Sequence, residues 1–191
     1  MDTEHIRKTI GVDYIPFRLM IPEVVAEASQ LFFDLFNGTY NDEFKRNLVV
    51  NAIYAIPKGD VAVVGAVAVR MDTYITDSVG TGGTLADDAG NPSPTTAAIV
   101  GLNPFANFNG DTDLPSGISA RKEPTGGATL DQWVSVAHVF PEETNAALYA
   151  LQNQNILRAP IIVPPNFGIA VKQGSVASLN SYSFIVDFDV Y

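Results

Sequence analysis

Side chains able to do acid–base or nucleophilic chemistry are scarce in this chain. It has two histidines, His5 and His138, and no cysteine. The lack of cysteine excludes disulfides, thiolate zinc sites and cysteine nucleophiles. His5 lies in a charged N-terminal stretch, and His138 lies in an apolar run where a structural histidine is the preferred interpretation. There is no Gly-x-Ser-x-Gly elbow and no His-Glu-x-x-His zinc helix. The sequence therefore predicts no catalytic residue, no cofactor and no enzyme activity.

One glycine-rich run could in principle hold a phosphate. Gly80-Thr81-Gly82-Gly83 has the glycines of a phosphate-binding loop, but the downstream lysine is absent. It also lacks the strand before it and the helix after it that such loops require. We therefore interpret the run as a flexible loop without a ligand.

Oxygen-bearing side chains could instead bind a hard cation. Asn107, Asn109, Asp111 and Asp113 alternate as at the start of a calcium loop. The glycine falls at Gly110, however, and no glutamate closes the loop at the expected distance. Solvated turns explain these residues better, so no metal site is predicted.

Two acidic pairs and one glycosylation triplet complete the candidates. Asp87-Asp88 and the pair Asp187 and Asp189 are interpreted as solvated polar positions. Residues two apart in a strand share a face, so Asp187 and Asp189 need only an exposed face and no ligand. Asn37-Gly38-Thr39 has the form of an N-glycosylation acceptor, but no secretion signal accompanies it, and it is interpreted as incidental.

Composition narrows the classes of partner. The chain has 21 acidic and 11 basic residues and a net charge of −10, which repels the phosphate backbone of nucleic acids. The longest apolar stretch, residues 61–69, is far below the roughly 20 residues needed to span a bilayer. We expect a single domain over residues 1–191 that binds neither nucleic acid nor membrane. Residues 1–8 carry charges of both signs and do not resemble a secretory signal.

The C-terminus gives the clearest strand signal. Tyr182, Phe184, Val186, Phe188 and Val190 alternate with residues that are mostly polar, which predicts a strand with one buried face inside a sheet. Further strands are expected as a hairpin of residues 48–56 and 61–69 around the turn 57–60, a hairpin-like unit of 159–163 and 167–172 around Pro164-Pro165-Asn166, a strand at 133–140, and an edge segment at 13–21. The total is about six to eight short strands.

Two segments have the apolar spacing of helices, and one long segment has no periodicity. Residues 22–37 carry an apolar stripe that begins near proline and ends at Asn-Gly, although a strand remains an alternative because the run is aromatic. Residues 141–152 open with Pro-Glu-Glu, which favours a helix N-terminus. Residues 76–129 are rich in Gly, Pro, Asp and Asn, and we expect a long loop region there.

The C-terminal third then points to a family. The segment 157–171, with Ala159-Pro160-Ile161-Ile162-Val163-Pro164-Pro165-Asn166-Phe167 at its centre and a closing aromatic strand after it, resembles the last strands of small jelly-roll structural proteins of tailed phages and other viruses. Residues 47–70 are similar to the paired strands of those folds. The resemblance implies an antiparallel β-sandwich of jelly-roll type. Combined with the local patterns, it leads us to expect an all-β fold with one or two short helices, an N-terminal arm at 1–12 and a loop-rich insertion at 76–129.

The same resemblance implies a role in a viral particle. Such proteins decorate or cement capsids, generally as homotrimers bound to the major capsid protein or other virion proteins, and they are made in the host cytoplasm. The apolar strands exceed what one sandwich core needs, which independently favours an oligomer. A carbohydrate- or receptor-binding module, such as a fibre or spike component, is the alternative, with Trp133 as a stacking residue; the core is the preferred place for Trp133. An enzyme of cupin type would need a histidine cluster that two histidines do not supply.

Overall fold

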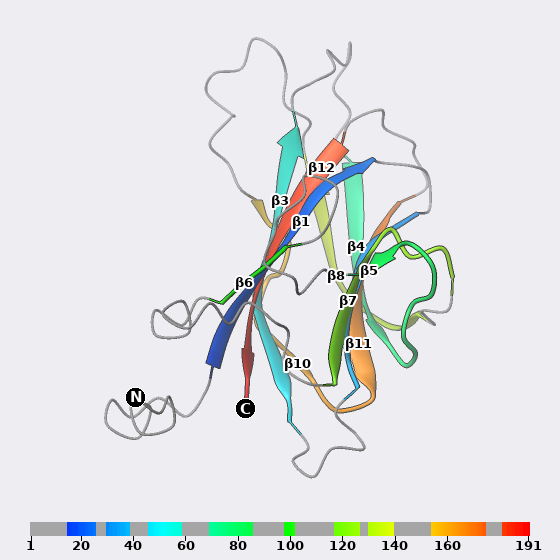
Figure 1. The fold of residues 1–191 in the computed structure, drawn as a ribbon. Helices are drawn as coiled ribbons and strands as arrows, with labels where there is room; N and C mark the ends of the chain where they lie inside the picture. The colour runs from blue at the N-terminus through cyan, green and yellow to red at the C-terminus, as the bar shows by residue number, and fades with distance from the viewer. Residues whose placement is uncertain are drawn as a thin grey trace, which may run out of the picture.

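The computed structural model describes residues 15–25, 30–38, 46–58, 69–85, 98–101, 117–126, 130–139, 154–174 and 181–191. Within these residues the protein is all-β, with two antiparallel sheets and no helix (Figure 1). The prediction of an all-β, antiparallel fold is therefore confirmed. The described part accordingly offers no helix long and apolar enough to cross a membrane.

The first sheet has the strand order β10-β3-β12-β1-β6, and β9 also pairs with β3. The C-terminal strand β12 lies between β3 and β1, as the alternation of its residues predicts. The strands of the first sheet are β1 (Ile15–Val25), β3 (Leu48–Lys58), β6 (Ala98–Gly101), β9 (Gln154–Asn155), β10 (Ile161–Val163) and β12 (Ser181–Val190).

The second sheet has the strand order β5-β7-β2-β11-β4-β8. The strand expected at 133–140 is present as β8, and that expected at 167–172 is β11. The strands of this sheet are β2 (Leu31–Asn37), β4 (Val69–Thr76), β5 (Thr84–Leu85), β7 (Ile118–Lys122), β8 (Leu130–Val139) and β11 (Phe167–Gln173).

The strand pairing is nested along the chain. The first strand, β1, pairs with the last, β12, and β2 pairs with β11. Further in, β3 pairs with β10 and β4 pairs with β8. The remaining strands are additions, because β5, β6 and β7 lie between β4 and β8 in the chain and β9 lies between β8 and β10. The polypeptide is thus arranged as one long antiparallel hairpin folded over itself, with neighbouring pairs placed in opposite sheets.

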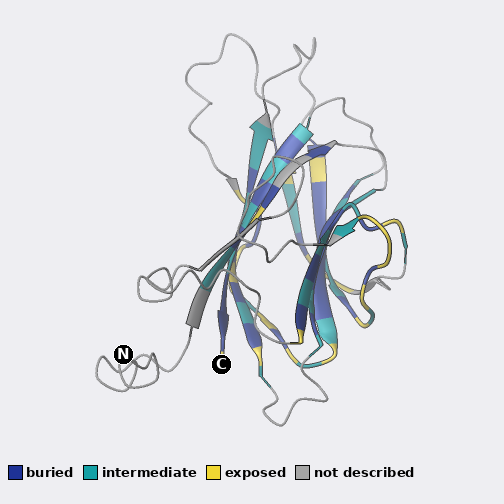
Figure 2. Ribbon diagram, viewed as in Figure 1, coloured by how far each residue is buried: buried dark blue, intermediate teal, exposed yellow. Residues whose placement is uncertain are grey.

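Aromatic residues join the two sheets. Phe184 of β12 contacts Phe32 and Phe33 of β2, with ring centroids 5.1 and 5.3 Å apart. Tyr182 lies 6.1 Å from Phe32 in the same cluster. All four side chains are fully buried, and the buried positions follow the strands of both sheets (Figure 2). Burying such rings removes a large apolar area from water and fixes the sheets against each other.

For residues 22–37 the helix is wrong and the alternative, a strand, is correct, because the structure forms strands at 22–25 and 31–37. Pro22 to Val25 end β1, and residues 31–37 are β2. The residues from Phe32 to Leu35 are all buried. Phe32 and Phe33 both contact Phe184 of the first sheet, because the register with β11 shifts between Phe33 and Leu31, and Asp34 is covered by the turn at Gly80. A shift of register interrupts the alternation of a strand, so the run imitates the apolar spacing of a helix. The second expected helix, at 141–152, lies outside the described residues.

Both predicted hairpins need correction. The strands β10 and β11 belong to different sheets, so the turn Pro164-Pro165-Asn166 carries the chain from one sheet to the other. Asn166 has φ 69°, a left-handed conformation that asparagine tolerates in turns. In the other unit, β3 continues through Pro57 and pairs there with Tyr182, so the turn does not begin at this proline. Residues 59–68 lie outside the described residues, and Val69 starts β4 in the second sheet.

Two further expectations change. The segment 13–21 is not an edge, because β1 lies between β12 and β6. The region 76–129 is not only loop, because it supplies β6 to the first sheet and β5 and β7 to the second. These strands are too short for periodicity to reveal them. The N-terminal arm, residues 1–12, lies outside the described residues.

Candidate functional site

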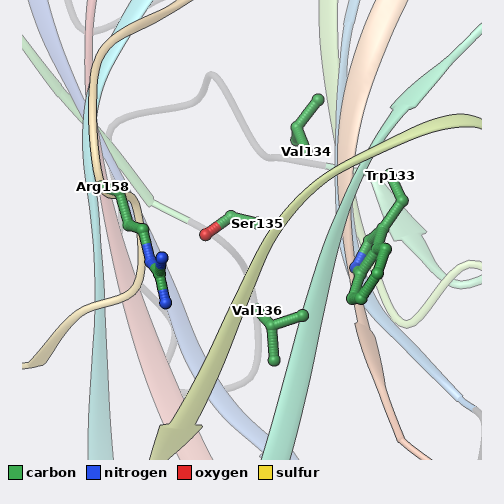
Figure 3. A pocket seen from close by; sticks show the side chains of 5 residues that line it. All are labelled: Trp133, Val134, Ser135, Val136 and Arg158. Atoms are coloured by element: carbon green, nitrogen blue, oxygen red, sulfur yellow. The ribbon is translucent and has the colours of Figure 1, made fainter.

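A shallow hollow borders the strand at the end of the second sheet. It has a volume of about 210 Å³ and is lined by Trp133, Val134, Ser135 and Val136 of β8, with Arg158 on the facing side. In Figure 3 the hydroxyl of Ser135 lies on the side of β8 that faces Arg158, whereas Trp133 lies on the other side of the strand. The hydroxyl of Ser135 donates a 2.9 Å hydrogen bond to the carbonyl of Ile156, which fixes the segment before Arg158 against β8.

Trp133 is exposed, so its predicted place in the core is wrong. Its side chain is 53% exposed, and in the register Trp133 lies opposite Tyr74 on the outer face of the sheet. The guanidinium carbon of Arg70 lies 5.5 Å from the centre of the ring, and Arg70 Nε donates a 2.8 Å bond to Asp72 Oδ1. A cation held over the ring orients it while leaving it accessible. A ligand with a flat apolar face could therefore stack on Trp133.

His138 is also exposed, so the interpretation as a histidine packed within an apolar strand is wrong. It lies opposite Arg70 in the register of β8 and β4. Within the described residues, no group of three His, Cys, Asp or Glu side chains could hold a metal ion. His5, Asp87-Asp88 and the alternating series from Asn107 to Asp113 lie outside the described residues.

Asp187 and Asp189 share the outer face of β12, but each has its own partner. Arg18 donates to Asp187 through Nε and Nη2 at 2.7 and 2.8 Å, and Asn51 Nδ2 donates to Asp189 Oδ2 at 2.7 Å. Asp189 is only 8% exposed, which corrects the prediction of a solvated position. Burial raises the pKa of Asp189, and the charge of Asp187 raises it further, while the bond from Asn51 opposes the change. The pair is a structural element of the sheet.

Asn37 is unsuitable as a glycan acceptor in the folded protein. The residue is fully buried, and its Nδ2 donates to the carbonyls of Arg46 and Val163 at 2.8 and 3.1 Å. Because Val163 belongs to β10 and Asn37 to β2, these bonds tie the two sheets together. The interpretation of the triplet as incidental agrees with this burial.

The glycine-rich run covers a buried carboxylate that sequence reasoning missed. Asp34 of β2 is 1% exposed, and its Oδ2 accepts a 2.6 Å hydrogen bond from the amide of Gly80. A side chain at Gly80 would collide with Asp34 and Pro124, so only glycine allows this close approach. A second link comes from Arg121, whose Nη1 donates to the carbonyl of Gly82. The run is thus a turn fixed over the outer face of the sheet.

This carboxylate makes stability depend on pH. Burial raises the pKa of Asp34 above the ordinary 3.8, although the bond from Gly80 and the charge of Arg121 oppose the change. A carboxyl with a raised pKa in the folded state stabilises the fold below its unfolded pKa, and this contribution is lost as pH rises through the folded pKa. We expect wild type to lose stability relative to Asp34→Asn as pH rises from about 4 to 7.

Denaturant unfolding of both proteins across this pH range, at constant ionic strength, measures the difference. Comparing the two proteins cancels the titration of the other carboxyls, including Asp189. Parallel stability curves for wild type and Asp34→Asn would contradict the assignment of Asp34 as a titrating buried group.

Comparison with known proteins does not place this chain in a family. No protein-family model matches this chain, and no curated protein matches it.

Proposed function

We propose that this protein is a jelly-roll structural subunit of a viral particle, of the type that decorates or cements a phage capsid. The observation that carries the proposal is the nested pairing of strands, β1 with β12, β2 with β11, β3 with β10 and β4 with β8. Jelly rolls fold a long antiparallel hairpin into two sheets in this way, and they are common in viral capsid domains. The fold by itself does not assign a function, so the proposal also needs support from the chemistry of the surface.

Apolar side chains on the outside of the sandwich support assembly. Met20 of β1 is 42% exposed, and in the register it forms a row across the outer face of the first sheet with Ile185 and Tyr54. Large apolar residues that gather on one surface mark contacts with another protein.

Such a subunit acts mechanically. A protein that binds only the assembled shell adds its binding free energy to that state and so stabilises it. A homotrimer at a symmetry position multiplies several weak contacts through effective concentration. With a net charge of −10, the subunit stays soluble before it reaches the shell.

The test is binding to a shell. We expect the purified protein to co-sediment with particles assembled from the shell proteins encoded beside its gene, and to raise the temperature at which those particles open. The replacement Met20→Lys should weaken the binding if the outer face of the first sheet makes the contact. Failure of the wild-type protein to sediment with these particles, or to change their opening temperature, would refute the proposal.

Trp133 favours a second candidate function, a carbohydrate-binding module. An aromatic ring exposed over half its surface and fixed by Arg70 is suited to stack on a sugar. Binding of wild type to a glycan array, with loss of the signal in Trp133→Ala, would favour this function over assembly. Equal signals from the two proteins would exclude Trp133 as the sugar contact.

A further inference from the structure

Among the described residues, the sheets end in strands of very different length. The first sheet ends in β6, with four residues, and β10, with three, and the second sheet ends in β5, with two residues, and β8, with ten. Short edge strands offer few free N–H and C=O groups, which protects a sheet from pairing with another chain. The edge of β8 lacks this protection.

The central part of β8 also lacks the other common protective features, although Asp131 precedes it within the strand. Residues 132–137 read Gln-Trp-Val-Ser-Val-Ala, without a charge and without proline. Trp133 and Val134 are 53% and 36% exposed. Charged side chains and proline are the usual means of keeping an edge strand from pairing. In the part of the chain that the structure describes, the register with β4 shifts at Thr73/Tyr74, opposite Val134, and at Ile75/Thr76, and such shifts offer some protection to an edge.

A hollow lies beside this part of β8. The register with β4 shifts at Val134, and the hollow is lined by this residue, its neighbours in β8 and Arg158. Arg158 forms the facing wall and is exposed (Figure 3). Its guanidinium can donate to carbonyl groups of a strand that enters the hollow.

We infer that a second copy of this chain adds its own β8 to this edge, in antiparallel pairing about a two-fold axis. An antiparallel strand can pair with a copy of itself because the same surface serves both partners. Copies with a net charge of −10 repel each other, and they approach at least cost where the edge is uncharged, along residues 132–137. The inference rests on the proposed function, since it specifies one contact of an assembling subunit.

Cross-linking tests the contact directly, because a chain without cysteine forms disulfides only at introduced positions. Single cysteines placed at each position from 132 to 137 sample a two-fold axis anywhere along the uncharged run. A disulfide needs Cα atoms within about 7 Å, which cross-strand neighbours satisfy. Under mild oxidation we expect at least one of these variants to give several-fold more covalent dimer than Ile162→Cys, which is exposed on β10. Yields no higher than that of Ile162→Cys at all six positions would overturn the inference.

Light scattering supplies a second measurement. Wild type should have a mass that is an even multiple of 20.5 kDa, a hexamer if trimers meet through β8. Val134→Lys should halve that mass and keep the circular dichroism of wild type, whereas the matched control Ile162→Lys should change neither. A monomeric wild type, or a Val134→Lys protein of unchanged mass, would overturn the inference. Shell binding without cross-linking would refute the β8 contact alone, and cross-linking without shell binding would refute the proposed function alone.

Discussion

The replacement Phe184→Ala is expected to destabilise the protein by about 3–5 kcal/mol. The ring of Phe184 is fully buried and lies within 5.1 and 5.3 Å of Phe32 and Phe33 in the opposite sheet. Its removal loses the transfer free energy of the ring and leaves a cavity that the paired strands on either side cannot close. Because domains of this size are stable by about 5–15 kcal/mol, the loss is a large part of the total.

Denaturant unfolding measures the effect as a lower midpoint with an unchanged slope. Met20→Ala is the matched control, since Met20 lies on the neighbouring strand β1 but is 42% exposed, and its truncation should change stability by less than about 1 kcal/mol. Phe184→Leu keeps most of the volume and should fall between the two. Equal losses in Phe184→Ala and Met20→Ala would mean that the ring does not join the sheets.

The replacement Asn37→Ala is expected to cost about 1–3 kcal/mol through unsatisfied hydrogen bonds. Asn37 Nδ2 donates to the carbonyls of Val163 and Arg46, and the bond to Val163 is buried. Without the amide, the carbonyl of Val163 stays away from water and has lost this donor, and the second sheet loses a link to β10 in the first. The effect comes from the loss of polar contacts, with little loss of apolar burial.

Thermal unfolding at one pH measures the loss, and Asn47→Ala serves as the control. Asn47 is exposed, and its backbone makes the bonds to Tyr191, so removal of its side chain should be close to neutral. Asn37→Asp keeps the shape but loses the donors, and it should be at least as unstable as Asn37→Ala because a buried charge is added. A midpoint for Asn37→Ala equal to that of Asn47→Ala would contradict a role in joining the sheets.

The edge of β8 and the turn over Asp34 show that the role of a local run of residues depends on contacts with distant parts of the chain. Both follow from residue types that are visible in the sequence: an uncharged run at 132–137, and a glycine-rich run at 80–83. Among the described residues the first becomes the end of the second sheet because β8 pairs only with β4, and the second becomes a fixed turn because Asp34 lies beneath it. Neither outcome depends on the runs alone, since each is set by a neighbour distant in the chain.

By itself, the sequence determined that the protein is built of strands and that β12 has one buried face, because period-two alternation is a local property of successive side chains. The tertiary structure decided that β10 and β11 part into different sheets, that residues 31–37 form a strand and not a helix, and that Trp133 faces outward. Strand pairing joins residues far apart in the chain, such as Ile15 with Val190, and the face that becomes buried depends on which partners arrive. Local patterns contain no information on either choice when a strand is apolar on both sides.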